Sequence, residues 1–388
     1  MEGIELFAGG GGLLLGSALA GVRHHLAAEW NKWACKTIRE NSLAGHHLVN
    51  GIKVLEGDIR GIDWSTELLD SDSVDIVSGG PPCQPFSLGG LARYADDPRD
   101  MFPAMTHAIK QIIPKAFLVE NVKGLTRASF SSYFDYIKLR LTHPEIESKQ
   151  DEKWDEHYLR LKKESIFVRD TLTYNLHTVV VNAADYGIPQ HRHRVIIVGI
   201  RDDIGAEWEV PQRTHSGNAL AKLQEDGSYW DKHEVPSKQR VSIKQKAIND
   251  GLLPWVTVRD ALSGLPEPSL NTLNIWRDHI FQPGAKIYPG HTGSPLDEPS
   301  KALKAGVHGV PGGENMIRFP DGTVRYYTIR EAARIQTFPD DYALHGAWSE
   351  TMRQLGNAVP VQLAEIFMSS VVNSIKSVSH AKNTVCAA

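Results

Sequence analysis

The segment Leu6-Phe7-Ala8-Gly9-Gly10-Gly11-Gly12 decides the fold, because it leads from an apolar strand through a glycine turn into a helix. Glycine allows the backbone to turn sharply and to approach a ligand closely. The helix after the turn presents free amide groups and a positive dipole end to an anion. The glycines could form a ligand-binding loop or only an ordinary turn, and residues further along the chain have to distinguish these two interpretations.

Acidic residues come after the next two predicted strands. Glu29 lies about 20 residues beyond the glycine turn, and Asp58 comes after the strand beyond that. A carboxylate at this spacing suits the hydroxyl groups of a ribose. The two acids together favour a nucleoside-containing cofactor over a plain turn.

Apolar runs alternate with helical patterns through the first half of the chain. Strands are expected at residues 3–7, 25–28, 52–55, 74–78, 116–119, 177–182 and 194–200, with helices between most of them, for example at 33–41 and 105–113. This alternation predicts an α/β fold with a mostly parallel sheet that is covered on both faces. Only residues 183–193 separate the last two strands, which is too short for a helical crossover, so that pair should be antiparallel.

The second half of the chain is less regular. From about residue 202 to 322 the periodicity fades and Pro and Gly become frequent, which predicts a second, irregular domain. The expected division is a catalytic and cofactor-binding domain at 1–203, a second region at 204–342 and a C-terminal helical segment at 343–388. A solvated, partly helical insertion outside the core is expected at 142–163, and the last helix at 361–374 should be followed by a frayed tail at 377–388.

Charge is informative locally rather than overall. The net charge of −4 argues weakly against a DNA-binding protein, but only one face needs to meet phosphates. Residues 232–246 contain one acid, Glu234, and five basic residues: Lys232, Lys238, Arg240, Lys244 and Lys246. This run is either an ordinary solvated face or a phosphate-contacting patch.

Cysteine and histidine spacing predicts neither a disulfide framework nor a metal site. The three cysteines are Cys35, Cys83 and Cys386, and the histidines form no His-Glu-x-x-His pattern. The N-terminus has no basic leader, and no apolar run approaches the roughly 18 residues of a membrane helix. A soluble, cytoplasmic protein is therefore expected.

Cys83 is the first candidate for chemistry. It lies in Gly79-Gly80-Pro81-Pro82-Cys83-Gln84-Pro85-Phe86-Ser87, directly after an apolar strand, where α/β sheets place their ligands. A cysteine is usually a small buried apolar residue, but core cysteines do not normally lie between prolines. The segment therefore favours a nucleophile.

Other polar residues are expected at the same sheet edge. Glu120 ends an apolar strand, and its alternative interpretation is a solvated or capping residue. Gln190, Arg192 and Arg194 alternate at the start of a strand and should share a face, although a surface basic strand would look the same. His191 and His193 face the other way and need no function. Gly356-Asn357-Ala358-Val359-Pro360 opens the final helix and is uninformative alone.

Together these segments resemble the bacterial DNA (cytosine-5)-methyltransferases of restriction-modification systems, in order and over nearly the whole chain. The matching segments are 6–12, 79–87, 120–122, 190–195, 327–339 and 356–360. The resemblance implies a Rossmann-like methyltransferase domain that binds S-adenosyl-L-methionine, and a smaller target-recognition domain in the 204–342 region. Double-stranded DNA would lie between the two domains.

The resemblance also assigns site residues. The cofactor-binding residues it implies are Phe7, Gly9, Gly11, Gly12, Glu29, Trp30, Asp58, Ile59, Pro82, Asn357 and Val359. The catalytic residues it implies are Cys83, Glu120, Arg192 and Arg194, with Cys83 adding to C6 of a cytosine that is flipped out of the duplex. The two arginines would lower the pKa of the thiol and orient the base.

The residues alone leave rival functions open. They are an RNA cytosine-5 methyltransferase of the same architecture, a catalytically inactive DNA-binding homologue and a small-molecule methyltransferase that shares only the cofactor fold. The long irregular region and the retained Cys83 and Glu120 favour the DNA enzyme. It is expected to act as a monomer on a specific short site in the bacterial nucleoid, without membrane association and without a stable complex with a cognate endonuclease. The recognition sequence cannot be read from the chain.

Overall fold

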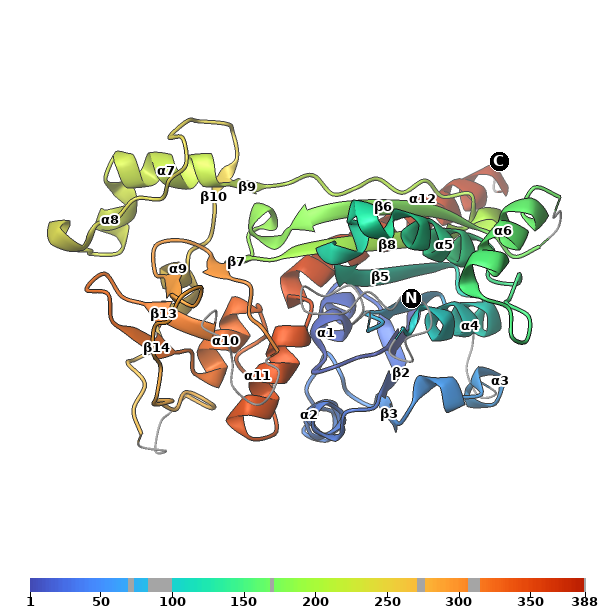
Figure 1. Cartoon of the computed structure of the whole chain (residues 1–388), viewed down its shortest axis with the longest axis horizontal. Coiled ribbons are helices and arrows are strands. Elements are labelled where there is room, and N and C mark those ends of the chain that lie inside the picture. Colours follow the sequence, from blue (N-terminus) through green and yellow to red (C-terminus); the bar gives the residue numbers. More distant parts are fainter. Residues whose placement is uncertain (69–72, 83–99, 168–170, 271–275, 306–314, 387–388) are drawn as a thin grey trace.

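The structure is a computed structural model that describes residues 1–68, 73–82, 100–167, 171–270, 276–305 and 315–386. One half of the molecule is built on a large sheet, and the other half carries the short elements of the 204–342 region (Figure 1). The C-terminal helix lies with the sheet half. The chain thus crosses to the second half and returns.

Within the described residues the central sheet has seven strands in the order β3-β2-β1-β4-β5-β8-β6. The strands are β1 (Glu2–Leu6), β2 (Arg23–Glu29), β3 (Lys53–Glu56), β4 (Ile76–Gly79), β5 (Ala116–Val122), β6 (Tyr174–Asn182) and β8 (His193–Arg201). The strands β1 to β5 pair in parallel, and β8 runs antiparallel to both β5 and β6. The predicted mostly parallel sheet with an antiparallel last pair is confirmed.

Helices cover both faces of this sheet. They are α1 (Gly12–Leu19), α2 (Lys32–Leu43), α3 (Trp64–Glu67), α4 (Phe102–Ile112), α5 (Ser131–Thr142), α6 (Trp154–Glu164) and α12 (Val361–Cys386). Because side chains alternate along a strand, Val195 and Ile197 of β8 join the core beneath α4 and α5, and Ile196 and Val198 join the core beneath α12. Apolar strands buried on both faces are what a parallel α/β sheet requires.

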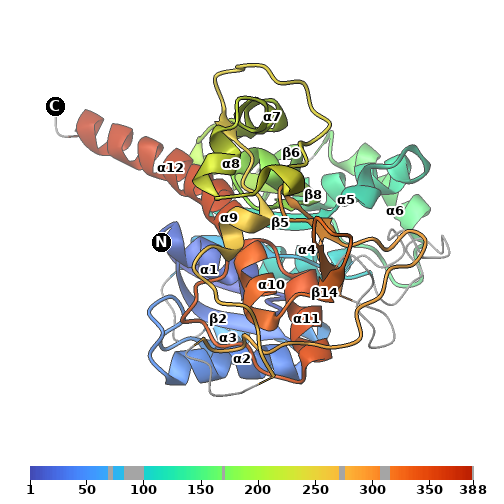
Figure 2. The ribbon, with the colours of Figure 1, turned by 90° about the vertical axis from the view of Figure 1, so that its left-hand side faces the viewer.

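The final helix is longer than predicted. It continues to Cys386, so the expected frayed tail at 377–388 is wrong for the described part of that range. No Pro or Gly interrupts α12, and Ile375, 2% exposed, keeps it anchored on the core beyond residue 374. Its last turns extend away from the body (Figure 2).

A stretch that covers α11 and much of α12 is apolar enough to resemble a membrane span. Trp348–Val378 meets the length and composition of such a helix, which was not expected from the sequence. However, 61% of its apolar window is buried inside the protein. Since α12 packs against α1 and the sheet, this stretch is a core element of the fold.

The insertion at 142–163 is more ordered than expected. Its helix α6 places Leu161, 0% exposed, in the main core, so the expectation that the segment lies outside the core is corrected there. His157 is also buried, with Nδ1 2.8 Å from the Tyr136 hydroxyl and Nε2 3.0 Å from the carbonyl oxygen of Ile146. An amphipathic helix buries one face, which charge density alone does not reveal.

The region after residue 204 forms two parts, both built from short elements. The first contains β9 (His215–Ser216), α7 (Gly217–Glu225), α8 (Ser228–Lys232) and β10 (Leu253–Pro254). It has a small core of its own, made of Leu220, Ala221, Tyr229, Trp230, Val235 and Ile243.

The second part packs directly on the sheet half. It comprises α9 (Val258–Leu262), β11 (Ser294–Pro295), β12 (Ser300–Lys301), β13 (Met316–Arg318), β14 (Val324–Tyr326), α10 (Ile329–Ile335) and α11 (Trp348–Asn357). Its core includes Leu14 of α1 and Ile38 of α2, and β12 pairs with the short strand β7 (Gln190–His191) that precedes β8. The described residues also form short 3-10 helices at Ile59–Gly61, Lys123–Thr126, Ala128–Phe130, Ala183–Tyr186, Asp202–Ile204 and Ser237–Gln239.

Candidate functional site

The glycine loop after β1 has an unusual backbone. Phe7, Gly9 and Gly11 all have positive φ, at 55°, 54° and 98°. For Phe7 this conformation is strained, and its half-buried ring packs on the core. No atom lies within 4 Å of the position that a Cβ on Gly9 would occupy. The backbone of Gly9 is therefore open to a ligand.

Gly11 and Gly12 are glycines for a different reason. A Cβ on Gly12 would lie 2.2 Å from the carbonyl oxygen of Val359, and one on Gly11 would lie 2.8 Å from the Tyr342 hydroxyl. Val359 is buried, whereas Asn357 at the end of α11 is exposed. The C-terminal segment thus lies directly against the glycine loop, and packing within the protein explains two of its glycines.

Glu29 holds the same loop from the end of β2. One carboxylate oxygen, Oε1, accepts the amides of Trp30 and Asn31 at 3.0 and 2.7 Å, and the other, Oε2, accepts the amide of Gly9 at 2.8 Å. Burial raises the pKa of the Glu29 carboxyl, while these backbone hydrogen bonds oppose the rise. Because a carboxylate oxygen can accept two hydrogen bonds, Oε2 has one position left.

Two more predicted cofactor residues lie beyond β3. Asp58 caps a 3-10 turn by accepting the amide of Arg60 at 3.0 Å. Its carboxylate also pairs with the Arg60 side chain, which lowers the pKa of Asp58. Ile59 is buried beneath this turn. Asp58 therefore has an internal partner, which a ligand would have to share or displace.

The polar, aromatic and backbone groups that this region presents fit S-adenosylmethionine. Glu29 has one free acceptor position for a ribose hydroxyl, the Trp30 side chain is 77% exposed and offers a face for an adenine ring, and Gly9 is open. These three features lie together because β1 and β2 are neighbouring parallel strands that end at one edge.

Cys83 lies outside the described residues, but residues on both sides of that gap are described. The carbonyl oxygen of Pro82, an exposed residue, accepts the amide of Met101 at 3.3 Å. Asn121 Nδ2 donates to the carbonyl oxygen of Pro81 at 3.0 Å. The chain therefore enters the Cys83 segment directly beside the end of β5.

Glu120 lies in the last part of β5, beside the place where the chain enters the Cys83 segment. A Cβ on Gly80 would lie 3.3 Å from Glu120 Oε2, so the glycine leaves room for the acid. Glu120 forms an ion pair with Arg194 Nε of β8, and the two side chains are only 9% and 14% exposed. A paired arginine keeps a largely buried carboxylate in a fixed orientation.

Arg192 has a different environment from Arg194. Its side chain is 1% exposed, and its guanidinium donates to the carbonyl oxygens of Leu303 at 3.2 Å and Gly356 at 2.9 Å. Burial and the charge of Arg194 lower its pKa. Arg192 thus connects β8 to both the second region and the segment beside the glycine loop.

Gln190 and Gln336 extend this buried network. Gln190 Nε2 donates to Gln336 Oε1 at 3.1 Å, and Gln190 Oε1 accepts the amide of Leu303 at 3.0 Å. Gln336 Nε2 also lies against the carbonyl oxygen of Leu355. Gln336 lies within the matching segment 327–339, but the sequence assigned it no role, because its partners are far away in the chain.

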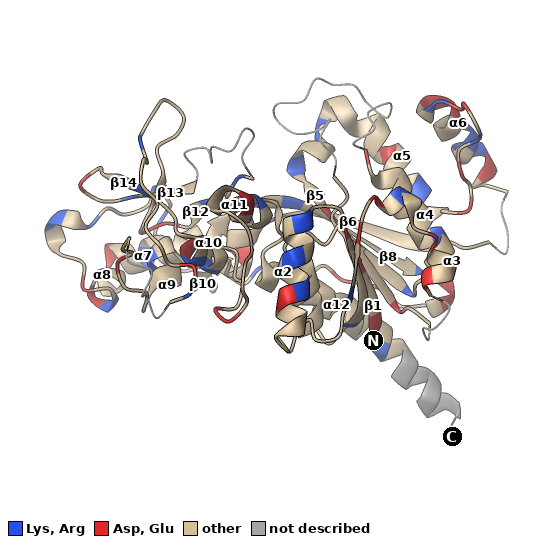
Figure 3. Ribbon diagram, turned by 90° about the horizontal axis from the view of Figure 1, so that it is seen from below, with Lys and Arg blue, Asp and Glu red and all other residues tan. Residues whose placement is uncertain are grey.

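The basic run at 232–246 is partly neutralised. Lys232 pairs with Asp260 at 2.7 Å and Arg240 with Asp231 at 3.2 Å. Lys238, Lys244 and Lys246 are exposed, and acidic and basic segments alternate around α8 (Figure 3). Three of the five cations therefore remain available to phosphates.

The fold and this sheet edge define a methyltransferase. The glycine loop, tied to an acid on β2, and the buried Glu–Arg pair both lie at the ends of strands of one α/β sheet. The family model for C-5 cytosine-specific DNA methylase matches residues 1–143 and 158–373, and the chain belongs to this family. The unmatched residues 144–157 fall within the predicted insertion.

Curated relatives are Type II methyltransferases. The chain is 30% identical to M.Eco47II of Escherichia coli over 384 residues, which covers 97% of the chain and 80% of the relative. It is 32% identical to M.NgoFVII of Neisseria gonorrhoeae over 362 residues, covering 92% and 83%.

Solved structures support the fold. A DNA modification methyltransferase encoded within an E. coli prophage has a TM-score of 0.61 at 20% identity, covering 97% of this chain and 99% of that one. The Dnmt2 methyltransferase of S. pombe has a TM-score of 0.57 at 17% identity, covering 96% and 98%.

Proposed function

We propose that this DNA methyltransferase transfers a methyl group from S-adenosylmethionine to carbon 5 of cytosine within a short site in duplex DNA, as the modification enzyme of a Type II restriction-modification system. The observation that carries the proposal is the buried Glu120–Arg194 pair beside Gly80, three residues before Cys83. The family membership and the names of the relatives support the same reaction.

The cofactor would lie along the ends of β1, β2 and β3. Glu29 Oε2 would accept a ribose hydroxyl, and the exposed Trp30 would pack on the adenine. When bound, S-adenosylmethionine supplies an electrophilic methyl group. The proposed pocket also includes Phe7, Gly9, Gly11, Gly12, Asp58, Ile59, Pro82, Asn357 and Val359.

The cytosine is activated by a covalent bond to the protein. The Cys83 thiolate adds to C6 of the ring, and Glu120 hydrogen-bonds N3 and the exocyclic amine and so stabilises the protonated ring, which makes C5 nucleophilic. C5 would then bond to the methyl group while the bond between that methyl group and the cofactor sulfur breaks, and the bonding electron pair would stay on the sulfur. Loss of the C5 proton to a base breaks the bond between sulfur and C6, restores the double bond and regenerates the thiolate.

The two arginines act differently in this proposal. Arg194 orients Glu120 and contributes positive charge that favours the Cys83 thiolate. Arg192 is a positioning residue, because both of its carbonyl partners lie within the protein backbone. It keeps the Gly356 segment against the second region.

DNA would be bound between the sheet half and the 204–342 region, with the target cytosine flipped out of the stack, because C6 is inaccessible in a duplex. Exposed lysines such as Lys244 and Lys246 would contact phosphates. We propose a cytoplasmic protein that is nucleoid-associated through DNA and acts as a monomer. A cognate endonuclease would recognise the same site independently.

Covalent trapping tests the mechanism. A duplex with 5-fluorocytosine at the target site permits addition and methyl transfer but has no C5 proton to lose, so the enzyme should remain attached on a denaturing gel. Cys83→Ser should not be trapped, because a serine hydroxyl is a far weaker nucleophile. Cys35→Ser is the matched control and should be trapped like the wild type, since burial raises the pKa of the Cys35 thiol to about 12.

The target site must first be found by bisulfite sequencing of methylated plasmid DNA. Transfer RNA serves as the alternative substrate in the same methylation assay. An adduct with Cys83→Ser, or none with wild type on a proven site, would contradict the mechanism. Methylation of transfer RNA but not of duplex DNA would contradict the proposed substrate.

A further inference from the structure

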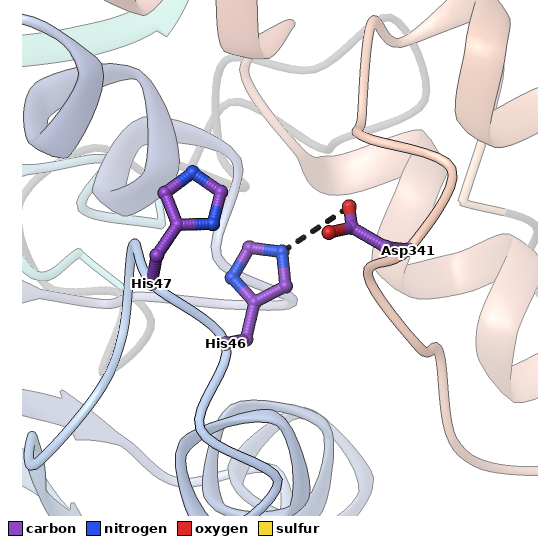
Figure 4. Close-up of side chains that lie close together, drawn as sticks. All are labelled: His46, His47 and Asp341. Carbon is purple, nitrogen blue, oxygen red and sulfur yellow. Dashed lines mark ion pairs between the residues drawn. The ribbon is translucent and has the colours of Figure 1, made fainter.

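His46, His47 and Asp341 are brought together from two distant parts of the chain (Figure 4). The histidines lie between α2 and β3, and Asp341 comes after α10. One potential ligand atom from each side chain lies within 4.8 Å of the other two. We propose that these residues form a binding site for a transition-metal ion of the Zn²⁺ class.

His46 supplies the observation that points to a ligand. Its side chain is only 5% exposed, and its Nε2 atom is buried without a hydrogen-bond partner. Because an unsatisfied buried polar atom costs free energy, this nitrogen is expected to have a partner in the functional protein. Nε2 is directed toward Asp341 Oδ1, which is 3.4 Å away.

This separation suits two ligands of one metal ion. Bonds of about 2.0–2.1 Å to a tetrahedral Zn²⁺ place neighbouring ligand atoms roughly 3.3 Å apart. The Leu48 amide donates to Nδ1 of His46 at 3.4 Å, a long hydrogen bond that costs little to lose when the ring proton moves from Nε2 to Nδ1. A neutral imidazole can therefore present the Nε2 lone pair to the ion.

The remaining ligands are available at the same place. His47 is exposed, and its ring, stacked on His46 with centroids 4.9 Å apart, can rotate to bring a nitrogen closer. Water can complete the coordination, because the three residues line an open hollow. Imidazole nitrogens with few carboxylates favour Zn²⁺, Ni²⁺ or Cu²⁺ over Mg²⁺ and Ca²⁺. Arg277 also lines the hollow, and its positive charge disfavours ions held by charge alone.

Metal binding at this place would act on the glycine loop. The His46 ring packs edge-on against Tyr342, with centroids 5.2 Å apart. The Tyr342 hydroxyl donates to the carbonyl oxygen of Gly10 at 3.2 Å. An ion held by His46 and Asp341 would therefore fix the residue that supports the glycine loop and stabilise the contact between the two halves of the chain.

The test is a Zn²⁺ titration of the full chain after removal of metals by a chelator, with a chromophoric chelator as competitor. Wild type should bind one equivalent, and added Zn²⁺ should raise its Tm. His47→Ala and Asp341→Ala change exposed side chains, so both variants should fold, and each should weaken binding by roughly tenfold or more. His107→Ala is the matched control, because His107 Nδ1 forms a surface pair with Glu147 at 2.9 Å, and this variant should bind like the wild type.

Cobalt distinguishes this site from the cysteines. Co²⁺ bound by nitrogen and oxygen should give a spectrum without a sulfur-to-metal charge-transfer band. Failure of wild type to bind Zn²⁺, or equal binding by the His47→Ala/Asp341→Ala double variant, would overturn the proposal. A charge-transfer band from thiolate ligands would also overturn it.

Discussion

Replacing each arginine of the Arg192/Arg194 pair by lysine separates two roles that the sequence could not distinguish. Arg192 donates to two buried carbonyl oxygens, those of Leu303 and Gly356, and a lysine ammonium in its place can reach only one of them with good geometry. Arg194 instead pairs with Glu120 and is 14% exposed. The two substitutions should therefore affect different properties of the enzyme.

These contacts set the expected magnitudes. A hydrogen bond from a charged donor contributes about 1.5–3 kcal/mol, and a buried carbonyl left without a partner costs about 1–3 kcal/mol. Arg192→Lys should therefore lower the free energy of unfolding by about 2–4 kcal/mol. Arg194→Lys keeps a cation beside Glu120 and should lower it by less, about 1 kcal/mol, because the ion pair is retained in a poorer geometry. Turnover of Arg194→Lys should nevertheless fall at least tenfold, because the guanidinium orientation of Glu120 is lost.

The measurements are urea unfolding of the purified chain and methyl transfer to DNA from labelled S-adenosylmethionine. Arg192→Lys should also bind the cofactor more weakly, since Gly356 precedes the segment beside the glycine loop. If Arg192→Lys unfolds at the wild-type urea concentration yet loses turnover, Arg192 belongs to the chemistry and the structural interpretation is refuted. A stability loss confined to Arg194→Lys would refute it equally.

Three further perturbations test the second region, the sheet and the insertion. Changing Lys244 and Lys246 to Ala together should weaken binding to all DNA sequences and reduce the salt-dependence slope by roughly 2 units; a loss restricted to the cognate site, with the slope unchanged, would mean that the run reads bases. Burial raises the pKa of Glu5 to about 8, so the folded protein retains a proton that the unfolded chain has lost, and stability should fall by about 1 kcal/mol per pH unit from about pH 6.5 to 8. Burial lowers the pKa of His24 to about 3, and this residue has the opposite effect on stability, but only below about pH 6.5. Thermal unfolding at a series of pH values measures the fall in stability, and Glu5→Gln should abolish it. An unchanged pH profile in this variant would show that another group causes the fall. Deleting 145–155 removes the Glu147 ion pairs with His107 and Lys110 and should lower stability by about 1–3 kcal/mol. Specific activity should stay within about an order of magnitude, and complete loss in a folded variant would give the insertion a role in DNA contact.

The sequence by itself determined the sheet and much of its functional edge. Strand alternation and the short 183–193 connection were sufficient to predict a parallel sheet with an antiparallel last pair, because both are local properties of the chain. Spacing alone indicated that Glu29 and the glycine turn would serve one nucleoside cofactor, which stays a prediction. The structure gives the contact, a hydrogen bond from the Gly9 amide to Glu29 at 2.8 Å.

Only the tertiary structure decided what the remaining residues touch. Arg192 and Arg194 are two positions apart and chemically identical, yet one is bonded to backbone 111 and 164 residues away and the other to Glu120. Gly12 is a glycine because Val359 packs on it, and His46 meets Asp341 across nearly 300 residues. Such contacts depend on how α2, α10 and α12 pack together, and periodicity records only which face of an element is buried, never which distant segment will cover it.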